Sequence, residues 1–248
     1  MKMEKTFTPD QIYAWSDANK TTPKTSAPAL ADAMELFSPL CRGWKGNCLL
    51  FYFSRYVHFW KCDAALLLKN WGLSDRIKVI DSANLSTGIG LLVVEAAIMA
   101  KNNRTASQIV SEIEKLKPNV RASFVVDTLT YLYRGGRCNA VAAMAGGVLK
   151  LHPRIVVEDG AMNASKKYRG KIASVVMNYV KDMEKDLKNA RQERVFITHS
   201  GCDREIVETV RTYLKNLGIF EEILETRAGG VVSSHCGPGT LGVLYISK

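Results

Sequence analysis

The sequence predicts an α/β protein with a parallel-sheet domain over residues 1–150 and a mixed-sheet domain over residues 151–248. In the first half, short apolar runs alternate with helical stretches, an order typical of a parallel sheet covered by helices on both faces. In the second half, strand-like runs are joined partly by turns, which favours a mixed sheet. A chain of 248 residues can form one large domain or two small ones.

The elements expected in the first domain include strands at 48–54, 76–82 and 121–129 and helices at 62–72, 87–103 and 105–118. The first strand, "CLLFYFS", is a continuous apolar and aromatic run of the kind found in buried strands. Thr105 or Ser107 is expected to cap the N-terminus of the second helix, since Thr and Ser are favoured at that position. The third strand is expected to run into a helix.

The second domain begins with two strands at 151–162, joined by an Asp-Gly turn. The elements expected next are one long amphipathic helix, a strand, a second helix and a strand-like run, at 169–190, 194–200, 203–217 and 220–228. The last strands are expected around "SSHCGPG", with His235 in a tight turn between them. A plain hairpin needs the glycines and proline of that turn but no imidazole, so His235 is a candidate ligand-binding residue.

The chain is basic, with a formal net charge of +10 and a pI near 9.3. Lys and Arg are spread along it without a run of five like charges, and no nucleic-acid recognition motif accompanies them. Such a balance suits an anionic lipid or an acidic protein as well as nucleic acid. A nucleic-acid partner is therefore not expected.

The cysteine and histidine patterns argue against disulfides and against a metal site. The six cysteines form no CxxC pair, and the four histidines show no HxH or HxxxH spacing. The N-terminus lacks the apolar core of a signal peptide, and the longest apolar run, 88–100, is too short to span a bilayer. These features predict free thiols, no metal and a cytoplasmic location.

Two enzyme classes lack their motifs. A nucleotide-binding fold would need a full GxGxxG after the strand that ends at Asp81 and Ser82, and only "GIG" (88–90) follows. A serine hydrolase would need GxSxG around Ser82, and this motif is missing.

Five stretches together resemble the DegV family of bacterial fatty-acid-binding proteins, and in order and spacing they cover almost the whole chain. They are "TSAP" (25–28), "VIDSANLSTGIGLLV" (79–93), "FVVDTLTYLYRGGR" (124–137), "KKYRGK" (166–171) and "HCGPGTLGV" (235–243). The resemblance implies a Rossmann-like parallel-sheet domain, a smaller mixed-sheet α/β domain, and a long-chain fatty acid in an apolar tunnel between them.

The resemblance also implies a lipid carrier rather than an enzyme. Family members of this kind take a fatty acid from the membrane and present its carboxylate to a separate, ATP-binding fatty acid kinase subunit. That partner forms the acyl phosphate, so the carrier itself needs no cofactor. The implied partners are the fatty acid, the kinase subunit and, transiently, an anionic membrane surface.

The chain departs from the family pattern in two places. Compared with the family pattern, the chain is expected to lack the N-terminal strand that ends in an Asp-Ser-Thr-like turn. After the strand at 48–54, "VHFWK" (57–61) replaces a Leu-Ser-Gly-Thr-Tyr turn and puts His58 where a serine hydroxyl would meet the carboxylate. His58 could supply an imidazole N–H instead, or it could pack beside Phe59 and Trp60, and both readings stay open.

By the same resemblance, the residues that bind the fatty acid are Thr25, Ser26, His58, Arg137, His235 and Gly237, and those that face the kinase in phosphate transfer are Arg169 and His235. A buried carboxylate needs hydrogen-bond donors and a cation, which hydroxyls, backbone N–H groups and arginine supply. Each residue type also has a structural alternative: an ordinary turn for Thr25 and Ser26, a helix C-cap before Arg137, a solvated basic face for Arg169, and a purely structural His235.

The favoured function is therefore a fatty-acid carrier that serves a kinase partner. The alternative is a degenerate or truncated relative that acts through protein contacts without binding lipid, which the missing strand and "VHFWK" favour. A third interpretation, an enzyme for a small acidic substrate, would need Arg137, Arg169 and His235 to converge without an apolar tunnel.

Overall fold

The computed structural model describes residues 7–26, 35, 48–52, 77–136 and 151–248. Contacts divide the chain into two compact units. The first comprises Met1–Thr25, Arg121–Glu158 and Met162–Lys248, and the second comprises Ser26–Val120 and Asp159–Ala161. This division differs from the boundary that the sequence predicts near residue 150, because the chain enters the first unit again at Arg121.

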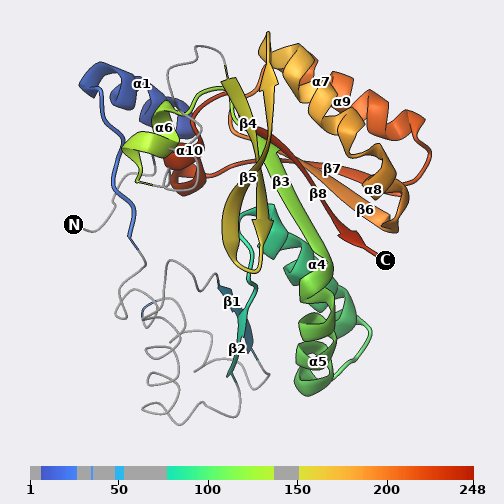
Figure 1. Cartoon of the computed structure of the whole chain (residues 1–248). Coiled ribbons are helices and arrows are strands. Elements are labelled where there is room, and N and C mark those ends of the chain that lie inside the picture. The colour runs from blue at the N-terminus through green and yellow to red at the C-terminus, as the bar shows by residue number, and fades with distance from the viewer. Residues whose placement is uncertain (1–6, 27–34, 36–47, 53–76, 137–150) are drawn as a thin grey trace. The chain divides into compact units, whose positions relative to one another are not determined.

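The first unit is built on a six-stranded mixed sheet in the order β5-β4-β3-β8-β6-β7 (Figure 1). β3 pairs antiparallel with β4, β8 pairs antiparallel with β6, and β6 pairs parallel with β7. The predicted α/β class with a mixed sheet is confirmed. The elements of this unit are α1 (Pro9–Asn19), β3 (Val120–Val125), α6 (Thr130–Arg134), β4 (Leu151–Glu158), β5 (Ala161–Arg169), α7 (Ile172–Asp182), α8 (Glu184–Lys188), β6 (Ala190–His199), α9 (Arg204–Asn216), β7 (Glu222–Arg227), α10 (Gly230–Cys236) and β8 (Leu241–Ser247).

The register places several strand termini at one end of this sheet. His199, the last residue of β6, pairs with Leu241 at the start of β8 and with Arg227 at the end of β7. Val125 at the end of β3 pairs with Arg154 near the start of β4. We call this edge the His199 end of the sheet. Because α10 follows β7 and precedes β8, the segment with His235 lies at the same end.

The second unit contains a parallel strand pair and two helices. Its elements are β1 (Cys48–Tyr52), β2 (Ile77–Asp81), α4 (Thr87–Lys101), α5 (Ala106–Leu116) and the 3-10 helix η2 (Lys117–Asn119). β1 and β2 run parallel, as predicted. The Thr105 side chain accepts a hydrogen bond from the backbone of Gln108, whose side chain bonds back to the backbone of Thr105. This capping box confirms Thr105, rather than Ser107, as the N-cap.

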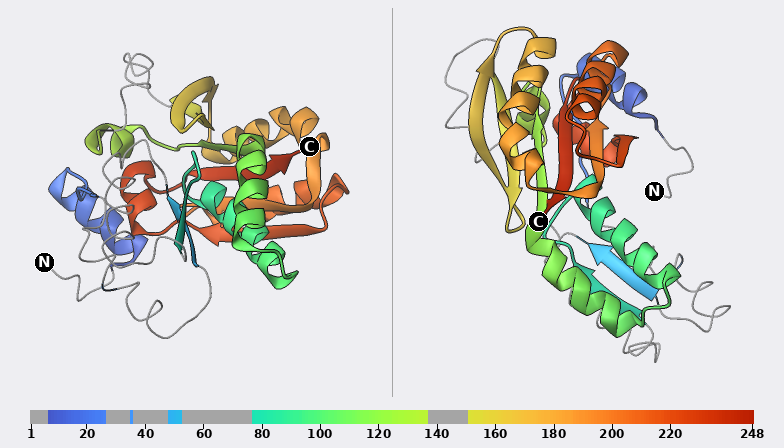
Figure 2. Two further views of the ribbon diagram at one scale, coloured as in Figure 1. Left: turned by 90° about the horizontal axis from the view of Figure 1, so that it is seen from below. Right: turned by 90° about the vertical axis from the view of Figure 1, so that its right-hand side faces the viewer.

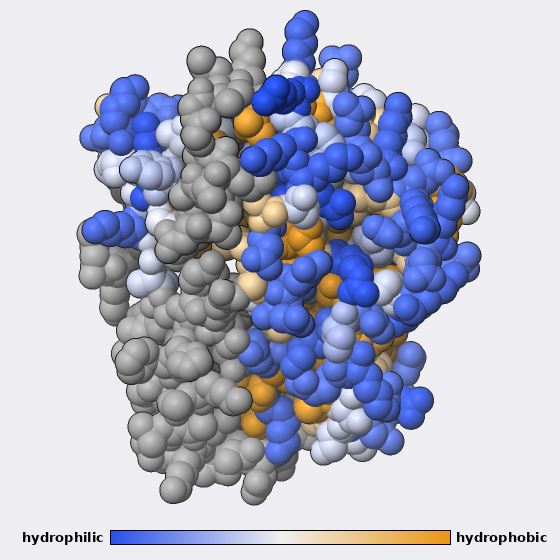
Figure 3. All heavy atoms as spheres, in the orientation of Figure 1, coloured by the Kyte–Doolittle hydropathy of each residue, from blue (hydrophilic) through white to orange (hydrophobic). Residues whose placement is uncertain are grey.

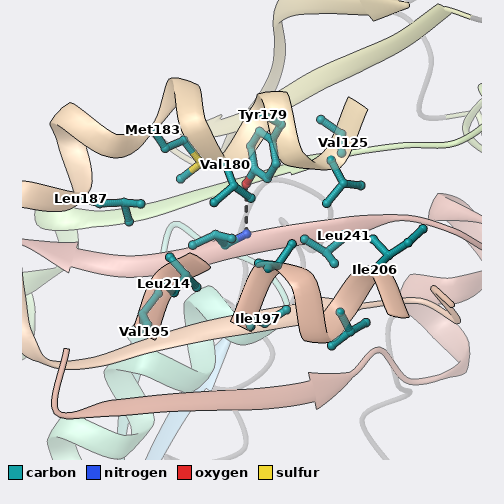
Figure 4. Packing of buried hydrophobic residues seen from close by; sticks show 14 of the residues in the cluster. Val125, Tyr179, Val180, Met183, Leu187, Val195, Ile197, Ile206, Leu214 and Leu241 are labelled. Carbon is teal, nitrogen blue, oxygen red and sulfur yellow. Dashed lines mark hydrogen bonds between the residues drawn. The ribbon is translucent and has the colours of Figure 1, made fainter. Parts of the chain in front are cut away.

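The core of the first unit lies between the sheet and the helices α7 and α9, which lie side by side on one face of the sheet (Figure 1 and Figure 2). Tyr179 of α7 is fully buried there, among valine, leucine and isoleucine side chains (Figure 4). Its hydroxyl donates to the carbonyl of Ser123 at 2.8 Å and accepts from the N–H of Val243 at 3.0 Å. Burial raises the pKa of Tyr179, so the hydroxyl stays protonated and can donate.

The predicted Asp-Gly turn joins β4 to β5. Asp159 and Gly160 have φ angles of 49° and 69°. Two successive residues with positive φ form the hairpin turn whose twist matches that of the flanking strands. Because a two-residue hairpin makes its strands antiparallel, Arg169 at the end of β5 returns to the His199 end of the sheet.

One predicted strand and one predicted helix differ from the structure. The strand expected at 121–129 ends at Val125 and belongs to the mixed sheet, since it pairs with β4. The single helix expected at 169–190 is two helices, α7 and α8, which meet at Met183. The helix α7 begins after Gly170. The φ of 121° at Gly170 bends the chain between β5 and α7.

Candidate functional site

His235 lies in the last turn of α10, a seven-residue helix, so the prediction of a tight turn between two strands is wrong. Within this helix the Ser234 hydroxyl donates to the carbonyl of Gly230 one turn earlier, at 2.7 Å. The tight turn comes directly afterwards. Gly237 ends the helix with a φ of 73°, a conformation that favours glycine.

Thr25 and His235 form the central contact of the site. Thr25 Oγ1 lies 2.6 Å from His235 Nε2, and both residues are half-buried. A hydroxyl has one proton to donate and two lone pairs to accept with. When the imidazole N–H donates to Oγ1, the Thr25 proton is left to donate to a ligand. The pair can therefore present a hydrogen-bond donor of fixed direction to an anion.

Gly135, which follows α6, makes room for the imidazole. A Cβ atom built at this position would lie 2.3 Å from His235 Nδ1 and 3.2 Å from its Cε1. Real Cβ atoms do not approach other atoms so closely, so any other residue at position 135 would displace the ring. Gly136 then turns the chain with a φ of 68°. Gly135 thus permits the close approach of the ring, and Gly136 has the positive φ that glycine adopts readily.

Three helices, α1, α6 and α10, surround this contact and lie together (Figure 2). Tyr13 of α1 and Tyr131 of α6 stack edge to face, with ring centroids 5.8 Å apart. Gly237 fits against the second ring, because a Cβ atom there would lie 2.7 Å from Tyr131 Cδ2. Gly237 is thus required both by its φ angle and by the Tyr131 ring.

Polar bonds fix these aromatic side chains in place. The Tyr13 hydroxyl donates to the carbonyl of Ser200 at 3.0 Å, just beyond the end of β6. The Tyr131 hydroxyl donates to Asp17 Oδ1 of α1 at 3.1 Å, and burial together with this bond raises the pKa of Tyr131 to about 12. The Ser200 hydroxyl donates to the carbonyl of Gly237. The helices and the His199 end of the sheet are thereby joined around His235.

Arg169 is the last residue of β5, an edge strand, and it is exposed. Lys166 and Lys167 are exposed on the same strand. Hydrophilic side chains predominate over β5 and α7 on the face shown in Figure 3. Among the described residues no contact joins Arg169 directly to His235, although both lie at the His199 end of the sheet.

The structure thus brings together some of the residues that the sequence suggests. Thr25 and His235 are in contact, and Gly237 is the C-cap of the helix that carries His235. Ser26 is exposed and begins the second unit. His58 and Arg137 lie outside the described residues.

Sequence reasoning missed the residues that support the site from α1. The signal for this helix is present in "TPDQ", because Thr8 and Gln11 form a capping box and Pro9 occupies the first helical position. The contacts of Tyr13 and Asp17 with Ser200 and Tyr131 could not be read from the sequence, since they join residues far apart along the chain.

The described residues offer little for other chemistry near the site. They contain no group of three or more His, Cys, Asp or Glu side chains placed to hold a metal ion. Burial raises the pKa of the Cys236 thiol to about 12, so this neighbour of His235 is not a nucleophile at neutral pH. None of the helices that the structure describes is long and apolar enough to cross a membrane.

Comparisons with known proteins identify the family. A family model described as "Uncharacterised protein, DegV family" matches residues 1–248. A DegV domain-containing protein of Caldanaerobacter subterraneus is 27% identical over 228 residues, which are 91% of this chain and 79% of that protein.

Solved structures show the same fold. The structure of a fatty-acid-binding DegV family protein from Thermus thermophilus matches with a TM-score of 0.84 at 25% identity, and the match covers 98% of this chain and 85% of the Thermus chain. A DegV family protein from Eubacterium eligens loaded with heptadecanoic acid shares the fold, with a TM-score of 0.79 at 17% identity over 96% of this chain and 85% of its own. The chain belongs to the DegV family.

Proposed function

We propose that this protein binds a long-chain fatty acid and that Thr25 and His235 hold its carboxylate. The observation that carries the proposal is the 2.6 Å contact between Thr25 Oγ1 and His235 Nε2. It joins a hydroxyl and an imidazole that are 210 positions apart in the sequence, so the contact is not a by-product of a local turn or helix. The fatty acids bound by the DegV proteins of Thermus thermophilus and Eubacterium eligens supply the ligand class.

The chemistry of the pair suits a carboxylate. A carboxylate accepts hydrogen bonds and donates none, so its neighbours must be donors. The Thr25 hydroxyl is such a donor when His235 donates to its oxygen, and a protonated His235 adds a positive charge. Gly135 and Gly237 keep space for the imidazole and for the Tyr131 ring that supports the turn. The site is thus built to hold one polar group in a fixed direction.

The remaining predicted residues complete the proposal. Ser26 and the backbone at Gly237 would add donors to the carboxylate, and His58 and Arg137 would add an imidazole and a cation. The exposed Arg169 would face the kinase subunit, which transfers the γ-phosphoryl group of ATP to a carboxylate oxygen and leaves ADP. The protein itself would then be a cytoplasmic carrier with no cofactor of its own, and the ATP chemistry would belong to its partner.

The first experiment is extraction of the natively purified protein with organic solvent, followed by mass spectrometry of the extract. We expect near-stoichiometric fatty acid, whose mass gives the chain length. Added fatty acid should also bind to delipidated protein. A protein that is empty and takes up no fatty acid would contradict the proposal and favour the relative that acts through protein contacts.

The kinase and membrane partners need separate measurements. With an ATP-binding fatty acid kinase subunit, ATP and bound fatty acid, hydroxylamine trapping should detect acyl phosphate. Arg169→Ala should lower this yield while leaving fatty-acid affinity unchanged, whereas Lys167→Ala is a matched control on the same exposed strand. Vesicles with anionic phospholipid should bind the basic protein more strongly than neutral vesicles do, and added salt should weaken this binding.

A further inference from the structure

His152, the second residue of β4, is a buried histidine that the proposed binding site does not use. Its Nδ1 atom lies 3.2 Å from the carbonyl oxygen of Val126, and its Nε2 atom lies 3.1 Å from the carbonyl oxygen of Gly170. Carbonyl oxygens only accept hydrogen bonds. Both bonds can form together only when each ring nitrogen carries a proton.

A carboxylate faces the same ring. Asp127 Oδ1 lies 3.6 Å from His152 Nδ1. Asp127 also lies against the turn that follows α10. A Cβ atom built at Gly239 would lie 2.9 Å from Asp127 Cβ. Asp127 therefore lies close both to Gly239, in the turn after α10, and to the His152 ring.

The acceptor of the second bond belongs to the sharp bend that follows Arg169. We call Arg169, Gly170 and Lys171 the corner. Gly170 has a φ of 121° and is exposed, and no atom lies within 4 Å of the place where its Cβ would be. Packing against that side of Gly170 therefore does not hold the corner. The bond from His152 fixes the direction of this carbonyl group, which belongs to the peptide between Gly170 and Lys171, one residue beyond Arg169.

We propose that His152, protonated on both ring nitrogens, is a positioning residue that holds the corner against the end of β3 and so fixes where Arg169 stands. Its bridge joins Val126, which follows β3, to Gly170, which follows β5. The part of this inference that concerns Arg169 as a kinase-facing residue rests on the proposed function. The bridge itself does not depend on it.

The first test examines the bridge alone. In the nitrogen-15 NMR spectrum of the full-length protein at pH 7, both ring nitrogens of His152 should show the shifts of protonated nitrogens. His152→Gln can reach one carbonyl but not both, so backbone hydrogen exchange at Gly170 and Lys171 should be at least tenfold faster in this variant. His199→Gln, which changes another histidine at the same end of the sheet, should leave exchange at the corner unchanged.

The second test asks whether His152 acts through Arg169. With the kinase subunit present, His152→Gln should reduce acyl phosphate formation about tenfold while fatty-acid affinity stays within about twofold of the unchanged protein. In the Arg169→Ala background the same change should have no further effect, because residues that act as one unit are not additive. An additive loss would overturn the role in positioning Arg169.

The two tests separate the failure of the inference from that of the proposed function. A spectrum with one unprotonated ring nitrogen overturns the bridge, and it needs no variant that must fold. Unchanged exchange at the corner in His152→Gln also overturns it. If the unchanged protein binds no fatty acid, the proposed function fails, while the NMR and exchange data still decide the bridge.

Discussion

Thr25 and His235 are 210 positions apart in the sequence, yet Thr25 Oγ1 lies 2.6 Å from His235 Nε2. The contact exists because α10 lies between β7 and β8, while α1, which leads to Thr25, packs against α10. His235 thus reaches Thr25 from a helix, and not from the hairpin that the sequence predicts. The helix places the imidazole beside the hydroxyl.

Thr25→Val removes the hydroxyl and keeps the shape of the side chain. The Kd for a long-chain fatty acid should rise about tenfold, or ~1.4 kcal/mol, because the carboxylate loses one donor. Isothermal titration calorimetry checks this value. Thr25→Ser should bind nearly as well as the unchanged protein, and Thr21→Val changes an exposed threonine as the control. Equal affinity for Thr25→Val would mean that the carboxylate lies elsewhere.

Gly135→Ala should displace the His235 ring, since the added Cβ would lie 2.3 Å from Nδ1. Fatty-acid affinity should fall by at least about tenfold. The ring signals of His235 in an NMR spectrum should shift at the same time. Gly136→Asn is the matched control, because asparagine tolerates positive φ and no atom lies near that position. Normal binding by Gly135→Ala would show that the imidazole position is not critical.

Tyr179→Phe should lower the free energy of unfolding by about 2–3 kcal/mol. The change leaves the buried Val243 N–H and the Ser123 carbonyl without the hydroxyl that now bonds to both. Urea denaturation measures the difference. The Tyr213 hydroxyl donates to Glu184 near the surface, so Tyr213→Phe should lower the free energy of unfolding by less than about 1 kcal/mol. A similar cost for the two variants would contradict the assigned role of the buried hydroxyl.

Asp182 makes stability depend on pH. Burial alone would raise the pKa of its carboxyl, but hydrogen bonds from Lys166 and Tyr168 outweigh burial and lower it. A lowered pKa in the folded state adds stability above the unfolded pKa of about 3.9, and this stability is lost as pH falls below it.

Because solvent screens the ion pair of this exposed carboxylate, Asp182→Asn should reduce stability by only about 0.5 kcal/mol at pH 7 and by less at pH 3. Urea midpoints at the two pH values, with Asp186→Asn on α8 as an exposed control, measure this. A deficit of the same size at both pH values would show that the ionised carboxylate contributes nothing.

The sequence predicts most strands and helices because their signals are local. The apolar run at 48–52, the Thr105 cap and the Asp159-Gly160 turn each depend on neighbouring residues. The prediction from sequence is wrong at α10. Two valines there suggest a strand, but the segment is a helix in which the Ser234 hydroxyl bonds to the Gly230 carbonyl.

Partners far apart in the sequence were harder to predict. The resemblance to the family suggested Thr25 and His235 separately, and nothing in their surroundings indicated that they touch. The supporting roles of Tyr13, Asp17 and Gly135 depend on three helices that meet only in the folded chain. Local patterns cannot encode such contacts.

The first unit is assembled from both sides of an intervening segment, since Met1–Thr25 joins Arg121–Glu158 and Met162–Lys248 while most of the second unit lies between them. A ribosome makes α1 early and α10 much later. The ion pair between Asp10 and Arg227 can form only after the 217 positions that separate them have been synthesised. A nascent chain consequently has no Thr25–His235 pair, and the proposed capacity to hold a fatty acid would arise only after α10 has left the ribosome.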